Sequence, residues 1–245
     1  MSQETYRHEL KYLISIPEWA LLRQRMLPFV RRDPHAGRIG EYHIRSLYFD
    51  DFRNSAYEEK ELGVLTRRKY RIRVYNCSDH LIRLERKSKF GQYIRKESAP
   101  LTREETEAIL DGEYGFLVNS SHNLLREFYF ECTSRIMRPR VIVDYEREPF
   151  VMEAGDVRIT FDKHVRAGFG RFLLFDPNLP AVEVVAEGQM IMEVKFTQFL
   201  PTQIRRLLPP RASQLTAASK YVLCCDAAPR EHSNHRTEGI VWKLR

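Results

Sequence analysis

The sequence predicts a strand-dominated α+β fold in which eight antiparallel strands form a β-barrel tunnel, flanked and plugged by helices. Eight segments alternate with a period of two residues and are rich in β-branched or aromatic residues, the pattern of half-buried strands. The 245 residues of the chain suit a single closed barrel better than two smaller domains.

The strands are expected at residues 5–14, 42–50, 67–76, 81–89, 92–98, 139–148, 156–162 and 190–197. Helices are expected at 17–30, 51–60, 102–110, 198–208 and 213–225. Thr102 and Glu105 have the spacing of a capping box, which marks the start of the third helix.

The distribution of Gly and Pro residues predicts where the chain forms loops. Residues 163–188 contain Gly168, Gly170, Pro177 and Pro180, which predicts a long loop. We expect residues 1–226 to form one domain and residues 227–245 to be a C-terminal tail.

The composition favours a folded protein with anionic partners. Apolar residues make up 43% of the chain, which argues against disorder, and the formal net charge is +7. No apolar run approaches the roughly 20 residues of a membrane span. The first residues, MSQETYRHELKYL, lack the apolar segment of a signal peptide, so we expect a cytoplasmic protein.

Several common catalytic sites lack their sequence signature here. The four cysteines, at 77, 132, 224 and 225, show no CxxC spacing, so we expect reduced structural thiols. The histidines have no metal-ligand spacing. No GxxxxGK[ST], HExxH or GxSxG motif occurs, which argues against a P-loop, a zincin and a nucleophile elbow.

Charged residues recur on one face of most predicted strands. In RRKYRIRVY the alternation puts Lys69, Arg71 and Arg73 on one face and apolar residues on the other. The same reading groups Glu85 with Lys87, Tyr145 with Arg147, and Glu193 with Lys195. An ordinary solvated outer face is the simplest explanation of one such strand. Its repetition on six strands favours a cationic lumen instead.

A cationic lumen requires an anion of high charge density. Unpaired charges in a poorly solvated site cost several kcal/mol each. A phosphate chain would compensate them, because Arg binds phosphate oxygens in a bidentate manner and Lys supplies a movable point charge. A nucleic-acid ligand is disfavoured, because the basic residues are not interleaved with exposed aromatic residues.

The motifs R-x-R, E-x-K-x-K, Y-x-R, V-R-I, E-V-K and S-K-Y occur in this order, with SLYFDD at 46–51 and KES at 96–98. From about Tyr6 to Cys224 the chain therefore resembles the VTC domain, the polyphosphate polymerase module of the CYTH-like triphosphate tunnel metalloenzymes. The resemblance implies that ATP and inorganic polyphosphate are the ligands and that a divalent cation, Mn²⁺ or Mg²⁺, is the cofactor. The resemblance also implies that the protein could work beside a membrane-protein partner that receives the polyphosphate chain.

The resemblance also implies the site. The positions that would hold phosphate are Lys11, Arg71, Arg73, Lys87, Lys96, Tyr145, Arg147, Arg158, Lys195, Ser219 and Lys220. Among these, Arg71, Arg73, Lys87, Arg147 and Lys220 are expected to act in catalysis, and Glu193 is expected to bind the metal. Ser219 and Lys220 match the family's helix that closes the tunnel. That helix has a further lysine where this chain has Ala217, so we expect it to bind phosphate less strongly here.

Some assignments stay open at this point. Glu9 and Glu85 could pair with neighbouring cations or contact the metal directly, and Lys69, Lys89 and Arg7 could lie at the rim. Metal-dependent polymerase activity is the first functional hypothesis. A triphosphatase or polyphosphate hydrolase of the same fold is the second, and a non-catalytic polyphosphate-binding sensor is the third.

Overall fold

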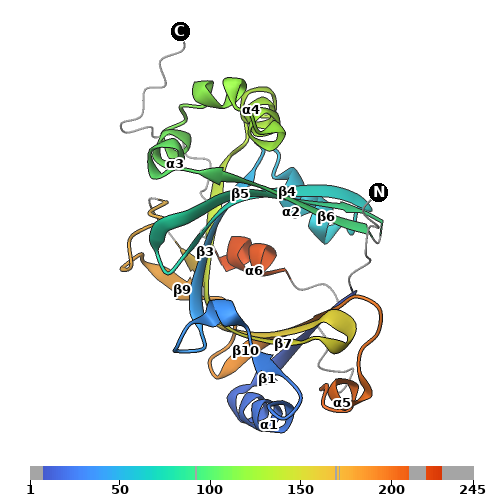
Figure 1. The fold of residues 1–245 in the computed structure, drawn as a ribbon. Helices are drawn as coiled ribbons and strands as arrows, with labels where there is room; N and C mark the ends of the chain where they lie inside the picture. The colour runs from blue at the N-terminus through green and yellow to red at the C-terminus, as the bar shows by residue number, and fades with distance from the viewer. Residues whose placement is uncertain (1–7, 92, 169, 171, 210–218, 228–245) are drawn as a thin grey trace.

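One antiparallel sheet curls around a central helix (Figure 1). The computed structural model describes residues 8–91, 93–168, 170, 172–209 and 219–227. Eight strands follow one another in the order β1-β10-β8-β7-β3-β4-β5-β6. They are β1 (His8–Ser15), β3 (Tyr42–Asp50), β4 (Thr66–Tyr75), β5 (Ser78–Phe90), β6 (Tyr93–Leu101), β7 (Arg138–Met152), β8 (Val157–Gly168) and β10 (Gln189–Phe196). Two short strands lie off this path: β2 (Arg31–Arg32) pairs with β7, and β9 (Ala181–Glu183) pairs with β8.

The strand-dominated antiparallel fold is confirmed, but the closed eight-stranded barrel is not. The sheet has ten strands, and no backbone pairing joins β1 to β6 among the described residues. A side-chain contact joins the edge strand β1 to β5, the neighbour of the other edge strand β6, since Lys87 Nζ of β5 lies 3.8 Å from Glu9 Oε2 of β1. The sheet therefore folds back on itself without closing its hydrogen-bond ladder.

The predicted loop at 163–188 was wrong in its first part, where β8 continues through Gly168, and at β9. The register between β7 and β8 shifts between Asp144 and Glu146, and His164 has a positive φ of 48°. A β-bulge of this kind places an extra residue in one strand and breaks the period of two. The alternation was therefore lost at this point, although the strand continued.

Six α-helices are described: α1 (Ile16–Met26), α2 (Ser55–Glu61), α3 (Arg103–Leu110), α4 (Asn123–Ser134), α5 (Thr202–Arg205) and α6 (Lys220–Ala227). The capping box of α3 is confirmed, because Thr102 and Glu105 each bond the other's backbone N–H. Helix α4 was not predicted. Its residues Leu124, Phe128 and Cys132 are buried at helical spacing. The predicted helix at 213–225 is described only from Lys220, because residues 210–218 lie outside the described part, as do 228–245 of the predicted tail.

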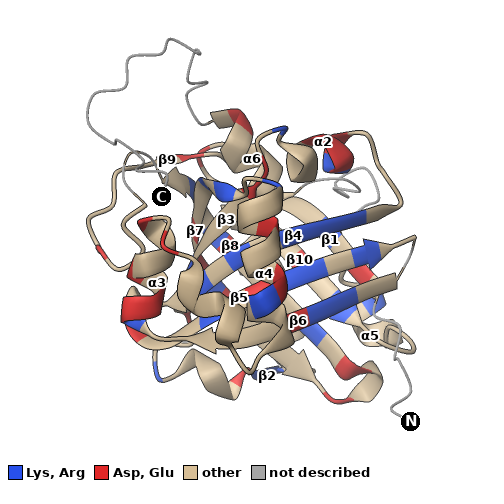
Figure 2. Ribbon diagram, turned by 90° about the horizontal axis from the view of Figure 1, so that it is seen from above, with Lys and Arg blue, Asp and Glu red and all other residues tan. Residues whose placement is uncertain are grey.

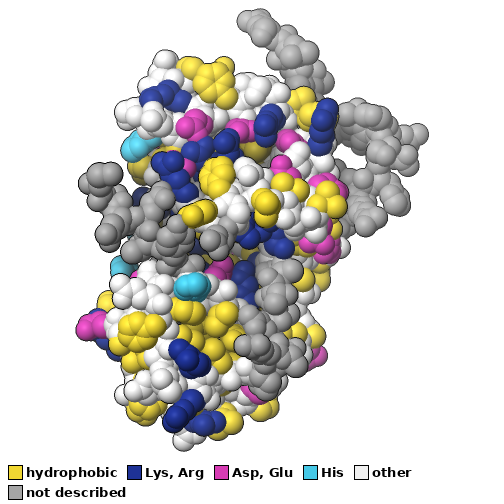
Figure 3. Space-filling model, turned by 90° about the vertical axis from the view of Figure 1, so that its right-hand side faces the viewer, with side chains coloured by type: hydrophobic (Ala, Val, Ile, Leu, Met, Phe, Trp, Pro, Cys, Tyr) yellow, Lys and Arg dark blue, Asp and Glu magenta, His cyan; other side chains and the backbone are white. Residues whose placement is uncertain are grey.

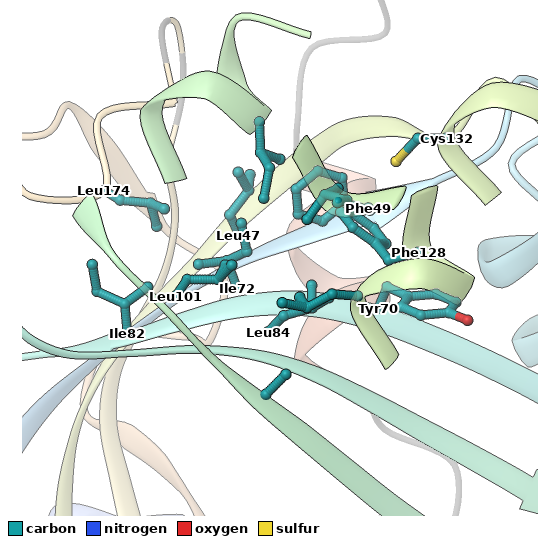
Figure 4. Close-up of a cluster of buried hydrophobic side chains, with 14 of the residues drawn as sticks. Leu47, Phe49, Tyr70, Ile72, Ile82, Leu84, Leu101, Phe128, Cys132 and Leu174 are labelled. Atoms are coloured by element: carbon teal, nitrogen blue, oxygen red, sulfur yellow. The ribbon is translucent and has the colours of Figure 1, made fainter. Parts of the chain in front are cut away.

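The outer face of the β3-β4-β5-β6 half is apolar and is covered by α3 and α4 (Figure 4). Leu47, Phe49, Tyr70, Ile72 and Leu84 contribute from the strands, and all are buried. Phe49 packs edge-on against Phe128 of α4, with ring centroids 5.0 Å apart. Removal of a fully buried Phe typically costs about 3–5 kcal/mol, so this contact secures the helices to the sheet.

The outer face of the other half is covered in the same way by α1 and α5 (Figure 1). Phe150, Ile159, Phe161 and Val194 supply the sheet side of this cluster, and Leu22 and Ile204 supply the helices. Because these apolar residues occupy outward positions, the charged residues that alternate with them along the strands face inward. This is the arrangement expected from the sequence.

Helix α6 lies within the curve of the sheet and packs on its inner face (Figure 1). Tyr221, Val222 and Cys225 are buried against a patch that includes Val143 and Val165. All four cysteines are free, which agrees with the predicted thiols. None of the described helices is long and apolar enough to cross a membrane.

Candidate functional site

The inner face of the sheet, defined as the side that faces α6, collects the charged residues of the strands. Arg71 of β4 is paired in register with Tyr48 of β3 and Glu85 of β5, and Arg73 is paired with Ser46. On the other half, Lys11 of β1 is paired with Glu193 of β10. The view from above shows Lys and Arg positions recurring along these strands (Figure 2).

The deepest part of the inner face is a buried group of four charged residues. Arg147 of β7 donates two hydrogen bonds to Asp162 of β8, from Nε at 2.6 Å and Nη2 at 2.7 Å. Lys220 of α6 lies 2.5 Å from Asp162 Oδ2 and donates a 2.7 Å hydrogen bond to Glu193 Oε1. Glu193 Oε2 is also 3.7 Å from Arg147 Nη2. Helix α6 is therefore fixed to β8 and β10 through a single ammonium group.

The cations around Glu193 keep it ionised in spite of its burial. Burial alone raises the pKa of this carboxyl, but Lys220, Lys195, Lys11 and Arg147 together lower its pKa well below the usual value. Lys195 Nζ is 3.1 Å from Glu193 Oε2, and Lys11 Nζ is 3.8 Å from Oε1. Glu193 thus carries a full negative charge at neutral pH within a cationic surrounding.

Toward the more exposed end, Glu9 pairs with three lysines. Its carboxylate lies 3.3 Å from Lys195 Nζ, 3.8 Å from Lys87 Nζ and 3.9 Å from Lys11 Nζ. The Lys87 side chain is 48% exposed, whereas that of Glu193 is 7% exposed. The inner face therefore runs from a buried end near Glu193 to a solvated end near Lys87.

Glu85 organises the cations of β4 and β6. It accepts a 2.7 Å hydrogen bond from Arg71 Nε and lies 2.5 Å from Lys96 Nζ. Burial opposes ionisation, but Arg71, Arg73 and Lys96 lower the pKa of Glu85 to about 2. Glu9 and Glu85 both form ion pairs with neighbouring cations, which is one of the two roles left open for them.

Arg73 and Tyr145 lie between the two ends. Arg73 donates to Ser46 Oγ at 3.0 Å and to the Tyr145 hydroxyl at 3.4 Å. The guanidinium of Arg147 and the ammonium of Lys220 each lie 5.2 Å from the centre of the Tyr145 ring. Tyr145 therefore spaces the cations of this region apart and orients them.

Two predicted positions have different surroundings. Arg158 donates to Asp33 Oδ2 at 2.9 Å and to the Tyr42 hydroxyl at 3.0 Å, so its side-chain contacts are with the segment after β2 and the start of β3. Ser219 precedes α6, and its hydroxyl is 3.5 Å from Lys69 Nζ. Ala217 lies outside the described residues. The other predicted cations take part in the contacts above.

The inner face carries more cations than carboxylates. Among the described residues, its cations include Lys11, Lys69, Arg71, Arg73, Lys87, Lys96, Arg147, Arg158, Lys195 and Lys220, and its carboxylates include Asp50, Glu9, Glu85, Asp162 and Glu193. From the side, Lys and Arg side chains are visible in the recess between the two halves of the molecule (Figure 3). Such an excess in a partly buried place favours the binding of a polyanion.

Asp162, Thr160 and Asp50 were not among the predicted site residues. Asp162 and Thr160 share the inward alternation of β8 with Arg158, which could have identified them. Asp50 accepts a 2.5 Å hydrogen bond from the Tyr221 hydroxyl and bonds from the N–H groups of Ala56 and Tyr57 at the start of α2. It therefore positions α6, which carries Lys220.

The residues present can contribute ligands to a divalent cation but do not form a complete site by themselves. Among the described residues, no three His, Cys, Asp or Glu side chains could hold a metal ion together. The hydroxyl of Thr160, opposite Glu193 in register, is buried and has no hydrogen-bond partner in the described chain. Mg²⁺ is usually held by one or two carboxylates, with substrate phosphates and water as its other ligands. Glu193, with Asp162 and Thr160 beside it, fits this arrangement.

The fold is similar to several solved structures of low sequence identity. The "putative adenylate cyclase" of Bacillus halodurans has a TM-score of 0.48 at 12% identity, with 83% of this chain and 84% of that chain covered. PH1012 protein from Pyrococcus horikoshii OT3 has a TM-score of 0.47 at 10% identity, with coverages of 88% and 98%. A conserved hypothetical protein from Pyrococcus furiosus has a TM-score of 0.46 at 11% identity, with coverages of 88% and 99%.

A comparison with curated proteins finds no match in sequence. The VTC domain family, in contrast, matches residues 6–228, which is most of the chain and includes every predicted site residue. The resemblance seen in the sequence motifs is thereby confirmed. This chain belongs to the VTC domain family, and its membership supports a function of the triphosphate-tunnel type in phosphate chemistry.

Proposed function

We propose that this protein is a metal-dependent polyphosphate polymerase that transfers the terminal phosphoryl group of ATP to a growing inorganic polyphosphate chain. The observation that carries the proposal is the row of cations on the inner face, which runs from the buried Arg147 and Lys220 to the half-exposed Lys87 and Lys96. A linear chain of phosphates has the charge and the extended shape to follow such a row. ATP and polyphosphate are thus the proposed partners, in the cytoplasm.

The proposed transfer breaks the bond between the β–γ bridging oxygen and the γ-phosphorus of ATP. A terminal oxygen of the polyphosphate chain forms the new bond, and ADP leaves with the bridging oxygen. The transition state is loose and spreads charge over the peripheral oxygens, so positioning and electrostatic stabilisation suffice. Arg71, Arg73 and Arg147 would hold these oxygens through planar, bidentate contacts.

Lys220 and Glu193 have complementary roles in this proposal. Lys220 reaches the buried end from α6 and would balance charge there, while Glu193 would hold the divalent cation together with the phosphates. The cation, when bound, would neutralise charge on the phosphate oxygens. Asp162 keeps Arg147 and Lys220 in place, since it contacts both.

The acceptor distinguishes this proposal from hydrolysis. Purified protein is incubated with ATP and Mn²⁺ or Mg²⁺, with and without a short polyphosphate primer, and the products are resolved by gel and phosphorus NMR. Long chains formed together with ADP, and lost in Glu193→Gln and Arg71→Ala, support the polymerase. Free phosphate without chains makes the protein a hydrolase, and tight binding without turnover leaves a polyphosphate-binding module.

Neighbouring positions on β6 offer a matched control. Lys96 faces inward and contacts Glu85, whereas Arg95 is 68% exposed and contacts Glu97. Lys96→Ala should lower turnover and raise KM for the chain, and Arg95→Ala should change neither. Equal effects of the two substitutions would show that net charge, and not the inner face, determines activity.

A further inference from the structure

A second group of chemically active side chains lies on the opposite face of the sheet, outside the site described above. Cys77 Sγ is 3.6 Å from His43 Nδ1, and His43 Nε2 is 2.8 Å from Asp144 Oδ2. A thiol, an imidazole and a carboxylate in this order are the arrangement of a nucleophile, its base and the group that orients the base. These distances would also suit a purely structural contact. The turn, the cavity and the charges around the three residues distinguish a reactive site from such a contact.

Cys77 occupies a backbone position that favours glycine. Asn76 and Cys77 are the two residues between the paired Tyr75 and Ser78, and they have φ values of 52° and 53°. Such a two-residue hairpin with positive φ at both positions is a type I′ turn, in which Asn-Gly is preferred. A cysteine here is strained, and strain of this kind gathers at functional sites.

The turn is bonded to the histidine itself. The His43 N–H donates to Asn76 Oδ1 at 2.9 Å, and the Asn76 N–H donates to the His43 carbonyl at 3.0 Å. The imidazole and the thiol are therefore held in register by the backbone on either side of them. This is the rigidity that a proton transfer between the two groups requires.

Cys77 lines a cavity of about 340 Å³. Leu110, Phe172, Leu174 and Phe175 provide its apolar wall. Arg45 connects this wall to the three residues: its Nε donates to Asp144 at 2.7 Å, and its Nη1 donates to the carbonyls of Leu173 and Leu174 at 3.2 Å each. A small molecule in this cavity would thus lie against the thiol.

The charge of the cavity differs from that of the inner face. Among the described residues that line it, the one arginine is Arg103, which is paired with Asp79 and Glu107 and lies over the Phe175 ring, 4.6 Å from the centroid. Asp176 adds a further carboxylate to the lining. A phosphate chain is therefore disfavoured here, and an uncharged ligand whose apolar group packs against Phe172 and Phe175 is favoured.

The protonation states suit general-base activation of the thiol. Burial raises the pKa of the Cys77 thiol, so it is protonated at neutral pH and must lose its proton before it can attack. Asp144 stays ionised with a pKa of about 2, because its bonds from His43 and Arg45 outweigh the effect of burial. An ionised Asp144 stabilises the imidazolium that forms when His43 takes the thiol proton.

We propose that Cys77, His43 and Asp144 form a second reactive site, in which the Cys77 thiol is acylated by an uncharged thioester or activated ester with a small apolar acyl group. The Cys77 proton moves to His43 Nδ1, and Sγ forms a bond with the acyl carbon. The bond from that carbon to the thiol or alcohol group breaks, and the leaving group takes the proton from His43. No oxidant, reductant or metal is required.

The probe is p-nitrophenyl butyrate, with release of p-nitrophenol followed by absorbance and the protein followed by intact mass and peptide mapping. We expect one butyryl group per chain, located on Cys77. Cys77→Gly should abolish it without loss of folding, because glycine suits the turn. Cys132→Ala, which removes a buried thiol of raised pKa, is the matched control and should leave acylation unchanged.

Dependence on His43 separates a built site from an exposed thiol. His43→Gln should slow acylation at least tenfold at pH 7 and far less at a pH at which the thiolate forms without a base. Should this variant unfold, the wild-type rate serves in its place, since general-base catalysis makes it slower in D₂O than in H₂O. Acylation at another thiol, a rate equal to that of free N-acetylcysteine, or equal rates in both solvents would overturn the proposal.

Discussion

Lys220 Nζ donates a 2.7 Å hydrogen bond to Glu193 Oε1, and this contact joins the central helix to strand β10. Burial opposes the charge of Lys220, but Asp162 and Glu193 raise its pKa above the ordinary lysine value. The ammonium therefore stays charged in the interior. Helix α6 does more than fill the curve of the sheet, because it supplies a cation to the candidate site.

Lys220→Met should weaken the binding of tripolyphosphate. Hydrogen bonds to charged groups contribute about 1.5–3 kcal/mol, so we expect Kd to rise roughly 10–100-fold. Titration calorimetry measures the change. Arg31→Met is the control, because Arg31 is 65% exposed and pairs only on the surface with Glu153. An unchanged Kd in Lys220→Met would remove Lys220 from the binding site.

Asp162→Asn should destabilise the protein. The Asp162 side chain is fully buried and pairs with Arg147 and Lys220, so its loss leaves two buried cations with less compensation. Breaking a buried pair in this way typically costs about 3–5 kcal/mol in the free energy of unfolding. Urea unfolding measures it, with the surface substitution Glu153→Gln as the control. A change below about 1 kcal/mol, the range of surface pairs, would contradict the prediction.

Glu85 should make stability depend on acid pH. Its pKa is about 2 in the folded protein and 4.5 in an ordinary environment, so the unfolded chain binds the proton more readily. The stabilisation is therefore present above about pH 4.5 and is lost as pH falls toward 2. Glu85→Gln should have a shallower pH dependence of the unfolding free energy in this window. Identical slopes for the two proteins would refute the assigned role.

Lys69 should take up a proton when a polyanion binds. Burial, together with Lys60 and Arg67, lowers the pKa of Lys69 to about 7, whereas Asp50 and Cys225 raise it slightly. Its ammonium lies 4.3 Å from the Tyr221 ring centre and 3.5 Å from Ser219 Oγ, beside α6. At pH 8 the lysine is mostly neutral, and a nearby phosphate chain would favour its charged form.

Calorimetry of tripolyphosphate binding at pH 8, in buffers of different ionisation enthalpy, measures the protons taken up. Lys69→Arg should bind without uptake at this position, because arginine is already charged. In the unliganded protein the lowered pKa of Lys69 also affects stability. Between about pH 7 and 10.5 Lys69 is protonated in the unfolded chain and neutral in the folded protein, so the free energy of unfolding rises with pH in this range. Equal uptake by wild type and Lys69→Arg would exclude Lys69 as its source.

The strand faces were predictable because the period of two is a local property. The alternation in β4, β5 and β10 placed Arg71, Glu85 and Glu193 inward, as the register has them. The period of two did not predict the strand where the local pattern is interrupted, at the bulge that includes His164. Helix α4 was not predicted either, although Leu124, Phe128 and Cys132 are apolar and have helical spacing.

The sequence by itself determined the strand-dominated class, the inward charge of the strands and the family. Only the tertiary structure decided which charges meet. Arg147 and Asp162 are 15 residues apart, and Lys220 and Glu193 are 27 apart, so no local pattern could show that all four form one buried group. The same holds for Cys77, His43 and Asp144, which strands β3 and β7 and the strained turn between β4 and β5 bring together. Contacts between distant segments depend on how the sheet curves and on where α6 packs, and these follow from the packing of the whole core.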